Sequence, residues 1–298
     1  MRLCRFDFEQ SDQNRLGIVE DDDVLDVTAA LDAIPPQRWP MPPGDLLIRY
    51  LPAVRARAES LRATAPRLKL ADVRLLSPVA NPSKIPAAPV NYRAHEAEAA
   101  ADPATFHGQQ VARIQEVGLF LKANSSLVGP SQGVVINHPD RRTDHEIELA
   151  VIIGTRCHRA SRDTAMSFVA GYAIALDMTL RGKQERSLRK SCDGFSVLGP
   201  WLVTADEIAD PGHLAMSLSV GNELRQQANT ADLVIDIPDL IVMASDYYTL
   251  EPGDIIMTGT PDGVGPVRVG DEMVCRIEGI GEMRVPVVAP VVAPAPVS

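Results

Sequence analysis

The stretch DHEIELAVIIG, residues 144–154, constrains the fold of this chain more than any other segment, because it joins acidic residues to a strand-like apolar run. Glu146 and Glu148 stand two positions apart at the start of that run. Successive side chains alternate across a β-strand, so we expect the two carboxylates to point to the same face. Two like charges side by side cost free energy unless a positive group lies between them. The sequence therefore predicts a cation beside a buried strand.

A second apolar run supplies a third acid. The segment GYAIALDMTL, residues 171–180, places Asp177 at the end of a run that should be buried, where an Asp is rare unless it is paired or metal-bound. Glu146, Glu148 and Asp177 would offer three carboxylates, which suits Mg²⁺, with Mn²⁺ or Ca²⁺ as alternatives. In the other interpretation the two glutamates lie on an exposed sheet face and Asp177 caps a turn. Spacing and burial leave both interpretations open.

The composition of the chain indicates which kinds of partner it is expected to bind. The chain has 298 residues, a formal net charge of −10 and 4% aromatic residues. A protein that binds nucleic acid needs a basic face and often aromatic side chains for stacking, so we expect no nucleic-acid partner. No apolar run reaches the length of a membrane span, and the first residues, MRLCRFDFEQ, do not resemble a signal peptide. The four cysteines show no CxxC spacing, so we expect free thiols and a cytoplasmic protein.

The order of segments predicts a β-rich α+β fold in two domains. Residues 1–78 are expected to form a small α/β domain, with two short strands around an acidic turn at 21–23 and a helical pattern over 45–63. A Pro-rich stretch then leads into a larger domain, residues 79–290, in which strands dominate. Its elements are candidate strands at 133–137, 147–154, 168–178, 214–221, 254–260 and 272–288, and one amphipathic helix at 236–248. Residues 291–298, rich in Ala, Pro and Val, are expected to be a flexible tail.

A dense cluster of polar and charged residues follows Asp177. Its members are Arg181, Lys183, Gln184, Arg186, Arg189 and Lys190. Such a run is usually a solvated helix face. This run comes directly after a candidate metal ligand and leads into KSCDGFSVLGPW, a segment whose Gly and Pro indicate turns. Its cations could therefore instead hold a carboxylate or stabilise an oxyanion. Lys190 is the preferred residue for that role, and Lys183 is the second choice.

Upstream, VNYRAHEAEA places His95 and Glu98 three positions apart. On a helical turn the two side chains share a face and could form a hydrogen bond, which would orient the imidazole to activate a water. The spacing by itself is common without any such role. The long polar segment after it, residues 99–118, has poor strand character and could be a lid.

Six motifs in order resemble the fumarylacetoacetate hydrolase family over roughly residues 79–287. The motifs are PSKIPAAPVNYRAHEAE, LFLKANSSLVGPSQGVVI, HEIELAVIIG, GYAIALDMT, LRKSCDGFSVLGPWLV and LEPGDIIMTGTPDGVGPVRVGDEM. Each motif alone is loose, but together and in this order they are specific. The chain is therefore identified as similar to this family, in particular to its bacterial acylpyruvate hydrolase-like members.

The resemblance implies a role for individual residues. Glu146, Glu148 and Asp177 would bind Mg²⁺ or a similar ion, His95 and Glu98 would activate water on a segment that orders with substrate, and Lys190 would be the catalytic lysine. The residues implied to contact substrate are Arg181, Gln184, Lys122 and Thr260. The resemblance also implies a mixed β-sandwich roll as the catalytic domain, a small N-terminal domain and a homodimer.

The chemistry that these residues could perform starts from a 2-oxo acid, whose two oxygens can chelate one metal that stabilises an enolate. In a hydrolase, His95 with Glu98 would take a proton from the attacking water, and Lys190 would stabilise the oxyanion. We therefore expect a Mg-dependent hydrolase that cleaves a C–C bond in an acylpyruvate-type 1,3-diketo acid, in aromatic compound catabolism. The alternatives within the family are an isomerase (of the 2-hydroxyhepta-2,4-diene-1,7-dioate type), a decarboxylase (of the oxaloacetate type) or a hydratase. The alternative of another class is a non-catalytic metal-binding protein.

Overall fold

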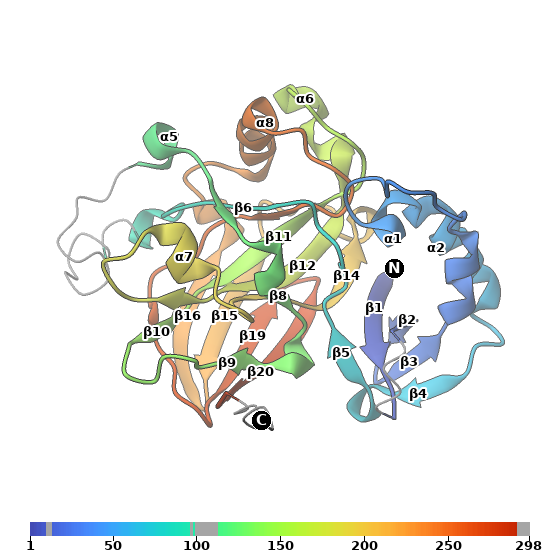
Figure 1. The fold of residues 1–298 in the computed structure, drawn as a ribbon, viewed down its shortest axis with the longest axis horizontal. Helices are drawn as coiled ribbons and strands as arrows, with labels where there is room; N and C mark the ends of the chain where they lie inside the picture. Colours follow the sequence, from blue (N-terminus) through green and yellow to red (C-terminus); the bar gives the residue numbers. More distant parts are fainter. Residues whose placement is uncertain (10–13, 96–97, 99–112, 291–298) are drawn as a thin grey trace, which may run out of the picture.

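The computed structural model describes residues 1–9, 14–95, 98 and 113–290. Figure 1 shows the N-terminal strands and helices, in blue, beside a larger body built mostly of strands. The predicted β-rich α+β class is confirmed by this architecture and by the solved structures compared below. The proposed lid at 99–118 falls largely, and the proposed tail at 291–298 wholly, outside the described residues.

The N-terminal part begins with three antiparallel strands, β1 (Arg2–Asp7), β2 (Arg15–Glu20) and β3 (Asp23–Asp26). The acidic turn predicted between two strands joins β2 to β3, and β4 (Arg67–Lys69) extends the sheet beyond β3. The predicted helical pattern becomes two helices, α1 (Leu46–Arg49) and α2 (Leu51–Leu61). Pro52 lies in the first turn of α2, where a missing N–H costs nothing, so the break falls just before it.

A central sheet carries the two acid-bearing strands. Its order is β4-β3-β2-β1-β14-β12-β11-β17-β6-β7, with β14 at Ser196–Thr204, β12 at Val169–Asp177, β11 at Ile147–Ile153, β17 at Ile255–Met257, β6 at Ile85–Ala87 and β7 at Phe120–Lys122. Two short strands pair off this path, β5 (Arg74–Leu76) with β1 and β8 (Leu127–Val128) with β14. Leu149 and Val151 of β11 face one apolar core, whereas Ala150 and Ile152 face the other. Burial on both faces explains why β11 reads as an unbroken apolar run.

A five-stranded sheet forms the second layer of the larger body (Figure 1). Its order is β16 (Glu223–Asn229), β15 (Ala215–Val220), β19 (Glu272–Ile277), β20 (Gly281–Val288) and β9 (Val134–Val135). Short turns at 221–222 and 279–281 join β15 to β16 and β19 to β20. A third, small sheet joins β13 (Thr179–Leu180), β10 (Thr143–His145) and β18 (Gly265–Pro266) beside the acid-bearing strands.

The predicted amphipathic helix is α8 (Ile237–Tyr247). Asp236 caps it by accepting a hydrogen bond from Asp239 N at 3.1 Å, and Leu240 and Ile241 are buried beneath it. The other helices named in Figure 1 are short, α5 at Ile114–Val117, α6 at Arg162–Ala165 and α7 at Arg186–Lys190. Among the described residues, no helix combines the length and the apolar character that crossing a bilayer requires.

Residues 196–204 correct the sequence analysis. The Gly and Pro of this segment predict turns, but the segment is β14, a fully buried strand between β1 and β12. Opposite Pro200 the pairing with β12 shifts register between Tyr172 and Ile174. A bulge of this kind accommodates a proline, which cannot donate a ladder hydrogen bond. The strand expected at 254–260 is also shorter than expected, because β17 ends at Met257.

Candidate active site

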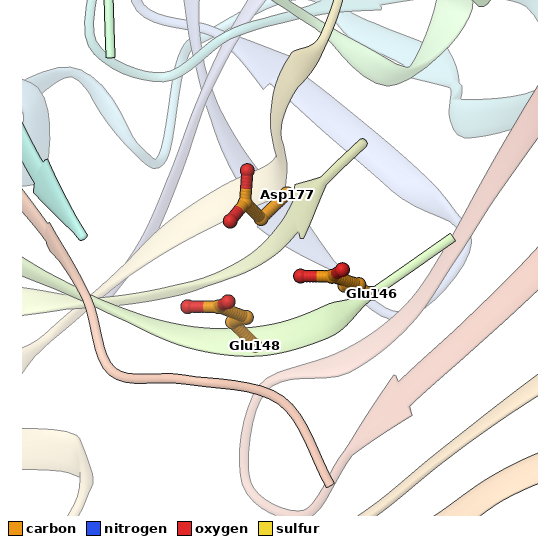
Figure 2. Close-up of side chains that lie close together, drawn as sticks. All are labelled: Glu146, Glu148 and Asp177. Carbon is orange, nitrogen blue, oxygen red and sulfur yellow. The ribbon is translucent and has the colours of Figure 1, made fainter. Parts of the chain in front are cut away.

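The three predicted acids lie together at the ends of β11 and β12. Glu146 comes just before β11, Glu148 lies on it, and Asp177 is the last residue of β12. The two strands are antiparallel, and Asp177 N donates to the Glu146 carbonyl at 2.9 Å, which sets the acids side by side. One ligand atom from each acid lies within 4.8 Å of the others, and all three residues are buried. Figure 2 shows Glu146 and Glu148 projecting to the same side of their strand, near Asp177.

Two of the acids have cationic partners. Lys190 Nζ contacts Glu146 Oε2 at 2.7 Å and Asp177 Oδ2 at 2.5 Å, and Arg181 Nη2 contacts Glu146 Oε1 at 3.2 Å. Burial would raise the pKa of Glu146, but Lys190 and Arg181 outweigh it and lower that pKa to about 2. Burial also works against the Lys190 ammonium, yet Asp177 and Glu146 raise the pKa of Lys190. Both groups are therefore charged at neutral pH.

Glu148, unlike Glu146 and Asp177, forms no ion pair with a cation among the described residues. Its Oε2 accepts a hydrogen bond from Gly259 N at 2.7 Å, but its Oε1 is a buried oxygen with no partner in the described part of the chain. Burial, followed by the negative charge of Asp177, raises the pKa of Glu148 well above its ordinary value. A buried acceptor without a partner is rare and calls for an explanation. A divalent cation that prefers oxygen would supply the missing partner and offset the clustered charge, so these residues fit such an ion.

His95 and Glu98 form the predicted pair. His95 Nδ1 lies 3.0 Å from Glu98 Oε2, and the other carboxylate oxygen of Glu98 accepts a hydrogen bond from Gly263 N at 2.9 Å. Partial burial would raise the pKa of Glu98, but the hydrogen bonds from His95 and Gly263 lower it. An ionised Glu98 can only accept, so His95 Nδ1 is the donor of this hydrogen bond and Nε2 is the ring nitrogen left to act as a base.

One pocket brings most of the predicted residues together. Those that line it are His95, Glu146, Glu148, Arg181, Lys183, Gln184, Lys190 and Thr260. Gln184 lies at the exposed rim, where its Oε1 accepts a hydrogen bond from Arg141 Nη2 at 2.9 Å. The pocket is lined by both acids and cations, a combination suited to a small anion held beside a metal.

Lys122 is not among the lining residues. Its side chain is fully buried behind Asp177, where the ammonium contacts Asp177 Oδ1 and donates to the Phe195 carbonyl at 2.8 Å. The structure therefore places Lys122 as a charge partner of Asp177 rather than at the pocket surface.

Several lining residues were missed by the sequence analysis. They are Ala88, Pro89, Val90, Phe120 and Gly182, and two of the clustered arginines, Arg186 and Arg189, were not singled out for a role. Arg186 lies over the ring of Phe120, with 5.4 Å from its guanidinium carbon to the ring centroid. Val90 has a φ of 40°, which is rare for a β-branched residue and, where observed, often marks a functional site. Backbone conformation of this kind leaves no signal in residue type.

Comparison with known proteins adds independent information. The family described as Fumarylacetoacetate (FAA) hydrolase C-terminal matches residues 84–288, and the one described as Rv2993c-like, N-terminal matches residues 1–78. A maleylpyruvate hydrolase from Aquipseudomonas alcaligenes is 53% identical over 287 residues, which cover 96% of this chain and 98% of that protein.

Solved structures of relatives share the fold. The maleylpyruvate hydrolase from Sphingobium sp. SYK-6, in complex with manganese (II) ion and pyruvate, is 44% identical with a TM-score of 0.81, covering 98% of this chain and all of that one (100%). The 5-carboxymethyl-2-hydroxymuconate delta-isomerase from Mycobacterium smegmatis is 31% identical with a TM-score of 0.70, covering 97% and 100%. The likeness therefore extends over both parts of the chain.

Proposed function

Because the chain belongs to the fumarylacetoacetate hydrolase family, we propose that it is a metal-dependent hydrolase that cleaves a C–C bond in an acylpyruvate. The observation that carries this proposal is that one pocket is lined by the buried acids Glu146 and Glu148 and by His95, the partner of Glu98. A metal site alone would serve any enolising enzyme, whereas a histidine–carboxylate pair beside it suits the activation of water.

Glu146, Glu148 and Asp177 would hold the metal through one oxygen each. The ion would act as a Lewis acid that stabilises negative charge on the oxygens of a 2-oxo acid. We propose Mg²⁺ because a site of carboxylates leaves room for water and substrate, and Mn²⁺ is supported by the ion in the Sphingobium structure. In the absence of such an ion, these three acids would repel a substrate carboxylate. We therefore expect metal binding to strengthen substrate binding.

The protein side chains would divide the work of hydrolysis. His95, oriented by Glu98, accepts a proton from the water that attacks the distal carbonyl. The Lys190 ammonium, which lines the same pocket, donates to the oxyanion that forms there. Arg181, Gln184 and Thr260 are the proposed substrate contacts.

The rim of the pocket favours an acyl group that ends in a second carboxylate. Lys183 and Arg186 line the pocket, and neither forms an ion pair with an acid among the described residues. Two such cations suit a dianionic acylpyruvate such as maleylpyruvate, the compound in the names of two relatives. A place in the catabolism of aromatic compounds would follow from that substrate.

Turnover with and without metal tests the proposal. Purified protein is incubated with maleylpyruvate and with acetylpyruvate, each with Mg²⁺, with Mn²⁺ and with EDTA, and pyruvate release is followed. We expect metal-dependent release of pyruvate, faster from maleylpyruvate, which EDTA abolishes and added metal restores. Absence of pyruvate from both substrates under every metal condition would refute the hydrolase proposal.

A second candidate function is isomerisation of a 2-oxo acid, which the Mycobacterium smegmatis relative favours. An isomerase would need the acids and a proton-transfer group but no attacking water. Decarboxylation or hydration would rest on the same acids. The maleylpyruvate hydrolases and the isomerase among the relatives are enzymes, which disfavours a non-catalytic metal-binding protein.

Assembly and location remain proposals. We propose a homodimer, to be checked by light scattering coupled to size exclusion, where a monomeric mass would contradict it. We also propose a cytoplasmic enzyme, supported by cysteines that are all free. Fractionation of the source cells tests this location.

A further inference from the structure

Gln226 reaches the active site from the five-stranded sheet. It lies on β16 and is 1% exposed, although its neighbours Leu224 and Gln227 face solvent. The pairing with β15 shifts there, because Leu218 faces Gln226 and Ser219 faces Leu224, which leaves Arg225 as an extra residue on β16. A bulge of this kind redirects a side chain, and here it turns Gln226 toward the site.

The Gln226 amide uses its full hydrogen-bonding capacity. Oε1 accepts from Ile147 N and contacts His145 Nδ1, both at 3.1 Å. Nε2 donates to Thr260 Oγ1 at 2.8 Å and to the Pro261 carbonyl at 2.9 Å. Since a backbone N–H can only donate and a carbonyl can only accept, these partners fix which end of the amide is oxygen.

This orientation sets the polarity of the Thr260 hydroxyl. Its oxygen accepts the Gln226 hydrogen bond, so its own proton must point elsewhere, and no acceptor for that proton lies among the described residues. Thr260 lines the pocket, and it follows Gly259, whose N–H donates to Glu148. The hydroxyl proton is therefore available to an oxygen of a ligand in this pocket.

Gln226 also ties the loop after β17 to the acid-bearing strand. Ile147, which it binds, stands between Glu146 and Glu148. Three residues beyond Thr260, Gly263 has a φ of 87°, and a Cβ there would collide with the Arg225 carbonyl, so only glycine allows the loop to approach β16 so closely. The N–H of Gly263 in turn binds Glu98.

We propose that Gln226 is a positioning residue that holds the Thr260 hydroxyl as a hydrogen-bond donor to a carboxylate oxygen at the 2-oxo acid end of the substrate. This inference rests on the proposed function, because it takes a 2-oxo acid as the ligand of the pocket. A donor fixed in advance strengthens binding of an anion, since the hydroxyl does not have to reorient when the ligand arrives.

The test uses oxalate, a stable dianion that resembles the carboxylate end of a 2-oxo acid, and the Mn²⁺-loaded protein. Its dissociation constant is measured by calorimetry for the wild type and for Q226E, T260V, T260S and Q227E. Q226E keeps an acceptor for Ile147 N but has no donor, so the Thr260 proton turns to the new carboxylate. Q227E adds the same charge one residue away on the exposed face and serves as the matched control. Mn²⁺ affinity and the thermal midpoint are measured for every variant.

We expect Q226E and T260V each to weaken oxalate binding about tenfold or more, the loss expected for a hydrogen bond to a charged group. T260S, which keeps the hydroxyl, and Q227E should stay within about twofold of the wild type. In the T260V background, Q226E should weaken oxalate binding little further, because both changes remove the same hydrogen-bond donor. If Q226E does not fold, Q226M replaces it, since it also lacks the donor and adds no charge.

Wild-type oxalate affinity in Q226E, or losses that add fully in the double variant, would overturn the positioning role. The kinetic constants for maleylpyruvate separate this inference from the proposed function. If the variants change oxalate affinity as expected but the wild type releases no pyruvate from maleylpyruvate, the hydrolase proposal fails and the role of Gln226 stands. If the wild type releases pyruvate but the variants do not change oxalate affinity as expected, the hydrolase proposal stands and the role of Gln226 fails.

Discussion

Glu148 lies fully buried beside Glu146 and Asp177, and one of its carboxylate oxygens has no partner among the described residues. Lys190 and Arg181 neutralise the other side of the cluster, while the charge on Glu148 is opposed by burial and by Asp177. In the absence of metal, Glu148 therefore destabilises the fold when it is ionised, and a bound divalent ion removes that cost. This single residue links metal binding to stability.

The substitution E148Q should separate these two effects. It keeps the size of the side chain and removes its charge, so the metal-free variant should unfold at a temperature equal to or above that of the metal-free wild type. Added Mn²⁺ should raise the melting temperature of the wild type but not of the variant, and metal-dependent turnover should disappear. The melting temperatures are measured by thermal unfolding with and without Mn²⁺. The control is E278Q, on the exposed turn between β19 and β20. Wild-type turnover in E148Q would contradict the ligand assignment.

A second prediction at this scale concerns His95. H95A removes the proposed base and leaves the acids in place, so hydrolysis of acetylpyruvate should slow by about 10²- to 10⁴-fold. Exchange of the methyl protons of pyruvate, which requires enolisation alone, should fall much less. Both rates are followed by NMR with Mg²⁺ present. Equal losses would favour an isomerase in which His95 transfers the proton of the enolisation step.

At the scale of elements, the sequence predicts the strands that consist of a continuous, buried apolar run and the helix that has one apolar face. β11, β12 and α8 were found in this way, and the acids on the first two strands identified the centre of the site. β14 was missed because Gly199 and Pro200 resemble a turn, and the bulge in the pairing of β14 with β12 that accommodates the proline has no signal in the local sequence. Gln226 was missed because its role depends on a bulge in another sheet and on partners 34 and 79 residues away in sequence. Non-local contacts of this kind have no signal in local residue patterns.

Helix α8 gives a prediction for an element outside the pocket. Asp236 caps the helix and forms an ion pair with Arg162, so D236A should lower the free energy of unfolding by about 1 to 2 kcal/mol without changing kcat. D246A, at an exposed position of the same helix, should change it by less than about 0.5 kcal/mol. Urea unfolding checks both. A D236A protein as stable as the wild type would show that the cap contributes nothing.

At the scale of the whole molecule, strand pairing joins the two parts of the chain. β1 pairs with β14 of the central sheet, and Leu3 and Leu16 share an apolar core with Leu198 and Leu202. The division at residue 78 therefore separates two regions of sequence that share one sheet and one core. The domain boundary remains a prediction, but the pairing shows what a cut there would expose.

A fragment consisting of residues 79–298 tests this arrangement. Removal of the first 78 residues would leave β14 unpaired where β1 binds it, at Leu202 and Val203, and would uncover the core on one side. The fragment should therefore aggregate or lose its native circular dichroism. Solubility, light scattering and circular dichroism are compared with those of the full chain. A soluble, folded fragment that binds Mn²⁺ would show that the larger part is an independent domain.

The central claim is that three buried acids share one divalent cation beside a water-activating histidine. A crystal of the full chain grown with Mn²⁺ and oxalate, with diffraction data collected at the manganese absorption edge, tests it most directly. We predict one strong anomalous peak within about 2.0 to 2.6 Å of an oxygen of each of Glu146, Glu148 and Asp177, with Lys190 displaced from at least one of them. Density that shows the three carboxylates still paired with Lys190 and Arg181, with no anomalous peak among them, would contradict the claim.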